Sequence, residues 1–409
     1  MQMNFKSRSA FFGATIAASA AMTGAWALDT GVTDSTIRIG TIGPFTGPAA
    51  SYSMVNKTDE AYMDMLNAEG GVCGRQIELV AYDDAYSPPK TLAAAKKLVE
   101  EDGVFLIYST IGTATNSAIR EYLNEQEVPH IFVSSGASKW GHRKEFPWTM
   151  GFHPPYTSEA KIYAKYILDT YPDGRIGILF QDDEFGKDFV NGLRAGLGEK
   201  ADEMIVSEQP YVTSDPDVDA QIANFKESGA DIVLYAAIPK FAGQAISNAQ
   251  EIEWKPTQFV VGVGRTAVLR LEPAAVEAAK GMITAHFTKV AQDPKWSDDE
   301  GMQKWNAFMD EYYPEGDKGH SATIVGYGVS QALEHVLKAA CDNLTRAGVM
   351  EAVSSMQNVE LDVLLPGITL NTSETDSYPI EQMQLMRFDG ERWELFGEVI
   401  DAWPLAMKN

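Results

Sequence analysis

Few residues of this 409-residue chain have the types and spacing that catalysis or metal binding needs. The chain contains no G-x-S-x-G nucleophile elbow, no H-E-x-x-H zinc motif and no Walker A phosphate loop. Its six histidines are dispersed, and no two lie four residues apart, the spacing that places two metal ligands on one helix face. We therefore predict a protein that is not an enzyme and that holds neither a metal ion nor another cofactor.

One glycine-rich segment has the pattern of a dinucleotide-binding loop. Residues 262–267 read G-x-G-x-x-A and follow an apolar run, as in that fingerprint. The segment lies late in the chain, and Pro273 interrupts the residues that would form the helix after the loop. Because the motif alone is weak, we interpret the segment as a glycine-rich turn after a strand.

The chain is strongly acidic, with 57 Asp and Glu against 33 Lys and Arg and a formal net charge of −24. It contains no basic run, so phosphate backbones would be repelled and we expect no nucleic-acid partner. Acidic clusters at 83–84, 182–184 and 298–300 lack the spacing of a calcium-binding EF-hand loop. The first two clusters follow predicted strands, which favours loop or helix-capping roles.

The first 27 residues have the pattern of a secretory signal peptide. Lys6 and Arg8 precede an uncharged stretch that is rich in Ala, Phe and Ile and ends in Ala25-Trp26-Ala27. Gly, Ser and Thr interrupt this stretch too often for a membrane anchor. We predict cleavage after Ala27 and an exported protein that lies outside the cytoplasm and does not itself span the membrane.

Two series of alternating strands and helices follow, and they predict an α/β architecture with two lobes. The first series has strands at 37–42, 77–82, 104–108 and 130–133, with helices at 56–68, 91–101 and 116–124. The second has strands at 175–180, 204–211, 231–236 and 258–261, with helices at 158–168, 186–197, 218–228 and 241–251. The remaining third is less regular, with helices at 302–312 and 321–340 and a hairpin of strands at 382–388 and 392–398.

Several short motifs, in order along the chain, resemble those of one protein family. They are IGTIGPFTGP at 39–48, NAEGGV at 67–72, YDDA at 82–85, SSGA at 134–137, DDEFG at 182–186, residues 250–256 and FDG at 388–390. Together they resemble the leucine/isoleucine/valine-binding family of ABC-transporter periplasmic solute-binding proteins. The resemblance implies the type I periplasmic-binding-protein fold, in which two doubly wound lobes, joined by a three-strand hinge, close on a small ligand. It also implies a monomer that serves an ABC permease in the inner membrane.

The same resemblance divides the chain between the two lobes. It places crossovers near 150–152, 285–287 and 366–368. The N-terminal lobe would then comprise residues 28–150 plus 286–366, and the C-terminal lobe residues 151–285 plus 367–409.

Carried over residue by residue, the resemblance also implies a ligand site. Gly112, Thr113, Ala137 and Ser138 match the family's carboxylate-binding loops, where helix N-termini offer unpaired N–H groups, although helix-cap and turn roles would also explain these residue types. Aromatic side chains would form the walls of the site. They are Tyr52, Trp140, Tyr156 and Phe185, and core packing remains an alternative for Phe185.

The sequence departs from the family where amino-acid binders hold the ligand ammonium. The position of that acidic residue falls on Val263, and a neighbouring aromatic position falls on Ala237 or Ile238. We therefore predict a carboxylate ligand without an α-ammonium, either aromatic or aliphatic, with Arg265 as a contact from the second lobe. Alternatively, Asp183 or Glu184 replaces the missing acid and the ligand is a branched-chain amino acid.

The chain has two cysteines, Cys73 and Cys341, which are too far apart in sequence for a C-x-x-C motif. The matched fold would place both at the end of the first lobe away from the cleft, so we predict a disulfide.

A solute-binding protein of an ABC importer is the function that these features favour. A ligand-sensing module of an extracytoplasmic receptor would use the same fold and is the alternative. An exported hydrolase or oxidoreductase is disfavoured by the missing motifs.

Overall fold

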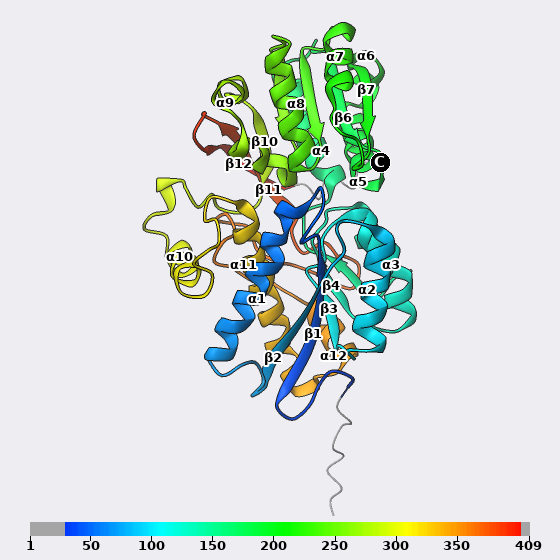
Figure 1. Ribbon diagram of the computed structural model, residues 1–409, viewed down its shortest axis with the longest axis vertical. Helices are drawn as coiled ribbons and strands as arrows, with labels where there is room; N and C mark the ends of the chain where they lie inside the picture. Colours follow the sequence, from blue (N-terminus) through cyan, green and yellow to red (C-terminus); the bar gives the residue numbers. More distant parts are fainter. Residues whose placement is uncertain (1–28, 402–409) are drawn as a thin grey trace, which may run out of the picture.

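The computed structural model describes residues 29–401. The predicted signal peptide, residues 1–27, lies outside the described residues. The described chain forms two α/β lobes, each built on its own sheet and stacked along the long axis of the molecule (Figure 1). The predicted two-lobed α/β fold is thereby confirmed.

The first lobe contains a five-stranded parallel sheet in the order β2-β1-β3-β4-β5. Its strands are β1 (Thr36–Gly43), β2 (Gln76–Asp83), β3 (Leu106–Tyr108), β4 (His130–Val133) and β5 (Thr149–Gly151). Its helices are α1 (Ser53–Ala68), α2 (Pro88–Glu100), α3 (Thr113–Glu125), α10 (Glu300–Tyr312), α11 (Ser321–Ala339) and α12 (Arg346–Val353).

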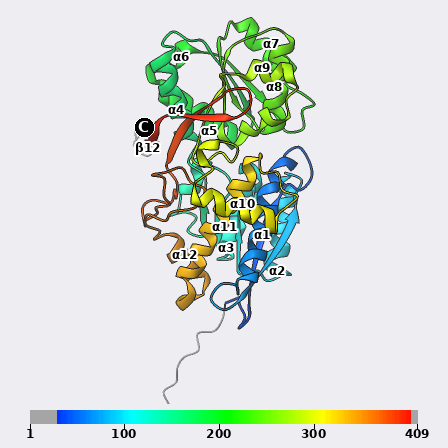
Figure 2. The ribbon, with the colours of Figure 1, turned by 90° about the vertical axis from the view of Figure 1, so that its left-hand side faces the viewer.

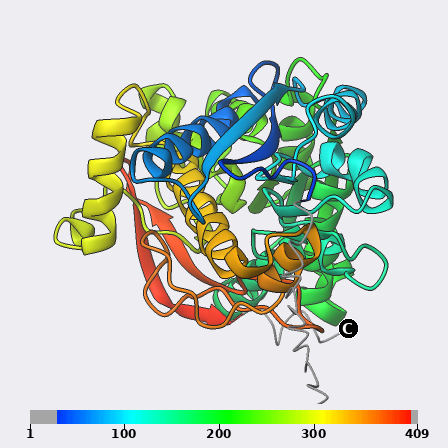
Figure 3. The ribbon, with the colours of Figure 1, turned by 90° about the horizontal axis from the view of Figure 1, so that it is seen from below.

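Alternate side chains of these strands fill two separate cores, because successive residues of a strand point to opposite faces of the sheet. Ile39 and Tyr108 pack on the face covered by α1 and α11, whereas Ile107 packs with α2 and α3. Seen from below, α11 lies beside α1 (Figure 3).

The second lobe contains a seven-stranded sheet in the order β12-β11-β10-β9-β8-β6-β7. Strands β6 to β10 are parallel, and β11 and β12 add an antiparallel hairpin at one edge. The strands are β6 (Ile176–Gln181), β7 (Ile205–Tyr211), β8 (Ile232–Ala236), β9 (Thr257–Val260), β10 (Ile283–His286), β11 (Gln382–Phe388) and β12 (Trp393–Asp401). The helices are α4 (Tyr156–Thr170), α5 (Glu184–Leu197), α6 (Ala201–Met204), α7 (Asp219–Ser228), α8 (Pro239–Glu251) and α9 (Pro273–Ala279).

Short 3-10 helices occur in both lobes. They are η1 (Ala50–Tyr52), η2 (Ser138–Gly141), η3 (Gly198–Lys200), η4 (Gly262–Arg270), η5 (Pro294–Trp296) and η6 (Cys341–Asn343). The glycine-rich segment at 262–267 thus lies in η4. Pro273 is the first residue of α9 rather than an interruption, because a helix tolerates proline in its first turn.

One predicted crossover lies elsewhere in the structure. Ile368, Leu370 and Ile380 are buried in the core of the first lobe, and Leu370 forms a β-bridge with Val359. The chain therefore rejoins the second sheet at Gln382 and not near 366–368. In Figure 2 the orange segment follows the lower lobe, and the red hairpin that comes after it lies against the upper lobe.

A disulfide joins Cys73 to Cys341, and the two Cα atoms are 5.4 Å apart. Cys73 follows α1, and Cys341 follows α11, so the bond links the ends of two helices that pack against each other. Within residues 29–401, no helix combines the length and the apolar character that a bilayer span requires.

Candidate ligand-binding site

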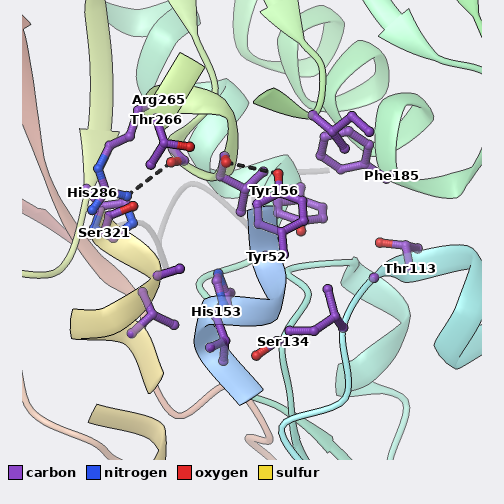
Figure 4. Close-up of a pocket in the computed structure, with 18 of the residues that line it drawn as sticks. Tyr52, Thr113, Ser134, His153, Tyr156, Phe185, Arg265, Thr266, His286 and Ser321 are labelled. Atoms are coloured by element: carbon purple, nitrogen blue, oxygen red, sulfur yellow. Dashed lines mark hydrogen bonds between the residues drawn. The ribbon is translucent and has the colours of Figure 1, made fainter. Parts of the chain in front are cut away.

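A cavity lies between the lobes, at the carboxyl ends of the parallel strands, where open α/β sheets place ligands. Its empty volume is about 630 Å³, part of which is open to solvent. The first lobe contributes Tyr52, Val55, Tyr86, Ile111, Gly112, Thr113, Ser134, His320, Ser321, Ala322 and Val325. The second lobe contributes Tyr156, Phe185, Ile238, Gly262, Val263, Arg265, Thr266 and His286, and His153 lies on the segment that links the lobes (Figure 4).

The first-lobe wall is built around the N-terminus of α3. Gly112 precedes this helix with φ of 99°, a conformation that side chains disfavour, and a Cβ there would lie 2.6 Å from the Tyr86 ring. No side chain caps the helix, so its first N–H groups remain available for an anion. The Oγ1 of Thr113, by contrast, is hydrogen-bonded to Ser135 Oγ at 2.7 Å.

A buried polar network holds this loop from behind. The Nδ2 of Asn116 donates to the carbonyl oxygens of Gly112 and Thr110, and the Oδ1 of Asn116 lies 3.0 Å from His130 Nε2. Burial lowers the pKa of His130 to about 3, so the ring is neutral. The network therefore orients the loop without placing a charge behind it.

Aromatic rings surround the middle of the cavity. Tyr156 and Phe185 pack edge to face with their centroids 5.2 Å apart, and both are almost fully buried. Phe185 therefore lines the cavity and also packs in the core. The Tyr52 hydroxyl donates to the Val263 carbonyl at 2.9 Å and so connects the two lobes. Tyr86 also lines the cavity, although it was not predicted as a site residue. Its position in the loop after a predicted strand could have identified it.

The second-lobe wall presents a buried cation. Arg265 is 4% exposed, and its Nη1 donates to the Gly262 carbonyl at 3.1 Å. Among residues 29–401 no carboxylate forms an ion pair with it. Burial lowers its pKa to about 9, so the guanidinium is still protonated at neutral pH.

One carboxyl group lies behind this wall. The Oε1 of Glu159 accepts hydrogen bonds of 2.6 Å from the Gly262 N–H and from the Tyr163 hydroxyl. Burial raises the pKa of Glu159 to about 7. Glu159 does not line the cavity.

Three of the six histidines line the cavity, although they are far apart in sequence. The Nδ1 of His286 lies 3.2 Å from the Thr288 N–H group, and the Nδ1 of His320 accepts from Ala322 at 3.2 Å. Burial lowers the pKa of His153 and His320 to about 4 and that of His286 further, and the positive charge of Arg265 acts in the same direction. All three rings are therefore neutral at pH 7. His153 and His286 lie at or beside predicted crossovers between the lobes, and this position could have identified them as cavity residues.

Four predicted site residues do not reach the cavity: Ala137, Ser138, Trp140 and Ala237. Trp140 is 1% exposed, because its ring turns into the core and its Nε1 donates to Ser135 Oγ at 3.0 Å. The N–H group of Ser138 donates to Asp188 Oδ2 at 2.7 Å instead of facing a ligand. Ala137 and Ala237 are buried in the core. The remaining predictions, Tyr52, Gly112, Thr113, Tyr156, Phe185 and Arg265, all line the cavity.

The two acids proposed as replacements for the missing carboxylate lie elsewhere. Asp183 caps α5, since its Oδ1 accepts from the N–H groups of Phe185 and Gly186. Glu184 forms an ion pair with Lys139 at 2.6 Å. Neither lines the cavity, and no group of metal-ligating side chains occurs among residues 29–401.

Comparisons with known proteins fit this geometry. A family model described as periplasmic binding protein matches residues 36–392. The leucine-specific-binding protein of Salmonella typhimurium is 27% identical over 275 residues, which are 66% of this chain and 72% of that protein. The leucine-, isoleucine-, valine-, threonine-, and alanine-binding protein of Pseudomonas aeruginosa is 26% identical over 266 residues, 64% of this chain and 69% of that protein.

Solved structures share the two-lobed fold. A branched chain amino acid ABC transporter from Thermus thermophilus with bound valine has a TM-score of 0.81 at 16% identity, covering 92% of this chain and 100% of that chain. A fatty acid ABC transporter substrate-binding protein from Thermomonospora curvata has a TM-score of 0.76 at 21% identity, covering 91% and 94%.

Proposed function

The chain belongs to the periplasmic binding protein family, whose members bind solutes and are not enzymes, and we propose that it captures a small carboxylic acid without an α-ammonium. In this proposal the protein is the extracytoplasmic solute-binding component of an ABC importer. It is a periplasmic monomer, cleaved after Ala27, that presents its ligand to an inner-membrane permease.

One observation carries the choice of ligand. Of the described residues 29–401, buried Arg265 lines the cavity and no acidic side chain does. A ligand α-ammonium would lie buried without a counter-charge, which costs several kcal/mol. A carboxylate without an amine avoids that cost.

Two further features support a carboxylate with an apolar body. The uncapped N-terminus of α3 offers N–H groups and the positive end of a helix dipole. The rings of Tyr52, Tyr86, Tyr156 and Phe185 offer an apolar surface beside it. The names of the relatives include leucine and fatty acid binders, and both ligands combine a carboxylate with an apolar chain.

A thermal-shift titration of the mature protein tests the proposal. A ligand that binds only the folded state raises the melting temperature. We expect hexanoate or benzoate to raise it and leucine to leave it unchanged. A shift with leucine and none with the acids would contradict the proposed ligand class.

A further inference from the structure

We propose that Arg265, Thr266, His286 and His320 form a second anion-binding subsite in the cavity, so that the ligand is a dicarboxylic acid. The inference rests on the proposed function, which places the first carboxylate at the N-terminus of α3. The second carboxylate would bind at the opposite end of the cavity.

The two ends of the cavity are separated by aromatic rings. Figure 4 shows Arg265, Thr266, His286 and Ser321 together on one side, and Thr113 on the other. The rings of Tyr52 and Tyr156 lie between them. A ligand that reaches both ends must therefore carry two polar groups on an apolar body.

The side chains of the second subsite are hydrogen-bond donors. The Nδ1 of His286 accepts from Thr288, and the Nδ1 of His320 accepts from Ala322. In a neutral imidazole the proton then resides on Nε2, so both rings are donors through that atom. Arg265 adds a guanidinium, which can only donate.

The same end of the cavity contains polar groups that lack partners. Thr266 is 6% exposed, and its Oγ1 has no hydrogen-bond partner in the part of the chain that the structure describes. Arg265 is 4% exposed and has no carboxylate partner among the described residues. Buried charges in proteins are normally paired and hydrogen-bonded. A ligand carboxylate would supply the counter-charge and accept from several of these donors at once.

Among the described residues, Glu159 is the carboxyl group that acts on Arg265, but it forms no ion pair with it. Its Oε1 is occupied by the Gly262 N–H and the Tyr163 hydroxyl, behind the wall that faces the ligand. Glu159 and Arg265 attract each other electrostatically but form no ion pair, so a ligand carboxylate would be the direct ion-pair partner of Arg265.

Isothermal titration calorimetry with matched acids tests the inference on the native protein. The dicarboxylates from succinate to suberate are compared with monocarboxylates of the same chain length, and terephthalate is compared with benzoate. Because charge-assisted hydrogen bonds are strong, we expect the best dicarboxylate to bind at least about tenfold more tightly than its monocarboxylate partner. Equal affinities would overturn the second subsite while leaving the proposed function intact.

Two variants locate the subsite. Arg265→Gln should remove most of the preference for dicarboxylates over monocarboxylates of the same chain length. Thr266→Val should reduce the preference less. Arg270→Gln is the matched control, because Arg270 lies in the same 3-10 helix but is exposed and does not line the cavity.

Other results would contradict these assignments. If Arg265→Gln weakens both classes of acid equally, Arg265 does not hold a separate second group. If Arg265→Gln fails to fold, the comparison of acids on the native protein and the Thr266→Val variant still decide the question. Binding of leucine but of no acid, or of no probe at all, would contradict the proposed function and this inference together.

Discussion

The two walls of the cavity offer different polar groups. The first-lobe wall offers the backbone N–H groups of the first turn of α3, and none of its described lining residues has a charged side chain. The second-lobe wall offers the guanidinium of Arg265 from a short 3-10 helix. Helix N-termini occur throughout an α/β fold, whatever the sequence, whereas a buried guanidinium requires an arginine at one particular position. Under the proposed function, the first wall would therefore provide a general carboxylate site and the second wall would provide selectivity.

The lobes also differ in covalent cross-linking. A disulfide joins α1 to α11 in the first lobe, and the second lobe has no cysteine. Replacing both Cys73 and Cys341 by Ser should lower the free energy of unfolding by about 2 to 5 kcal/mol, because the unfolded chain loses a long-range constraint. Urea unfolding followed by tryptophan fluorescence measures the change. An unchanged urea midpoint would show that the bond contributes nothing.

Ligand affinity is the control for that double variant. The 19 residues of α11 span about 28 Å at 1.5 Å per residue, and the cavity lies at the Ser321 end. We therefore expect the affinity of the folded protein for hexanoate to be unchanged. A weaker affinity would mean that the disulfide also positions the first wall.

The second wall should respond to pH through Glu159. Burial raises the pKa of Glu159 to about 7, so the folded protein binds this proton more tightly than the unfolded chain does. The resulting stabilisation of the folded state is fully present below pH 4.5 and is lost as the pH rises through about 7. Glu159→Gln keeps the side chain neutral, so the variant should gain up to about 3 kcal/mol relative to the native protein between pH 4.5 and pH 8. Urea midpoints at several pH values measure this difference.

An exposed glutamate provides the control for this titration. Glu203→Gln changes the same formal charge at a surface position of α6. We expect its stability to follow that of the native protein at each pH. A Glu159→Gln variant that also follows the native profile would mean that the second wall contains no buried titrating acid.

The first wall should be sensitive to backbone shape rather than to charge. Gly112→Ala places a Cβ 2.6 Å from Tyr86 Cε2 and Thr115 Oγ1 and also strains a residue with φ of 99°. We expect a loss of about 1 to 3 kcal/mol in stability and a weaker affinity for monocarboxylates and dicarboxylates alike. Calorimetry with hexanoate and adipate measures the second effect.

Gly281→Ala separates strain from crowding. Gly281 also has a positive φ, 87°, but a Cβ there would meet nothing within 4 Å. Its substitution should destabilise the protein without changing the affinity for either acid. If Gly112→Ala also leaves affinity unchanged, the α3 loop is not the carboxylate seat.

Sequence patterns predict the elements of both lobes closely, because strand and helix periodicities are local properties. The strand predicted at 130–133 coincides with β4, and the strand predicted at 37–42 differs from β1 by one residue at each end. The short strand β10 was missed, since Ile-Thr-Ala-His carries no clear alternation.

The directions in which side chains near the ends of strands point were harder to predict. Trp140 and Tyr156 both follow the fourth strand of the first lobe in sequence, yet Trp140 turns into the core and Tyr156 lines the cavity. Their orientation depends on distant partners such as Ser135, which no local pattern reveals. His286 and His320 meet at one cavity only because the chain returns to the first lobe between them.

The smallest expected effect concerns the bond that joins the two walls. The Tyr52 hydroxyl of the first lobe donates to the Val263 carbonyl of the second, so Tyr52→Phe removes one interlobe hydrogen bond and keeps the ring. A neutral hydrogen bond contributes about 1 kcal/mol, so the closed form and ligand affinity should weaken by about fivefold. Because Tyr52→Phe changes no charge and keeps the ring, the ratio of dicarboxylate to monocarboxylate affinity should stay constant. A changed ratio would mean that the two walls do not act independently and that selectivity depends on how the lobes close.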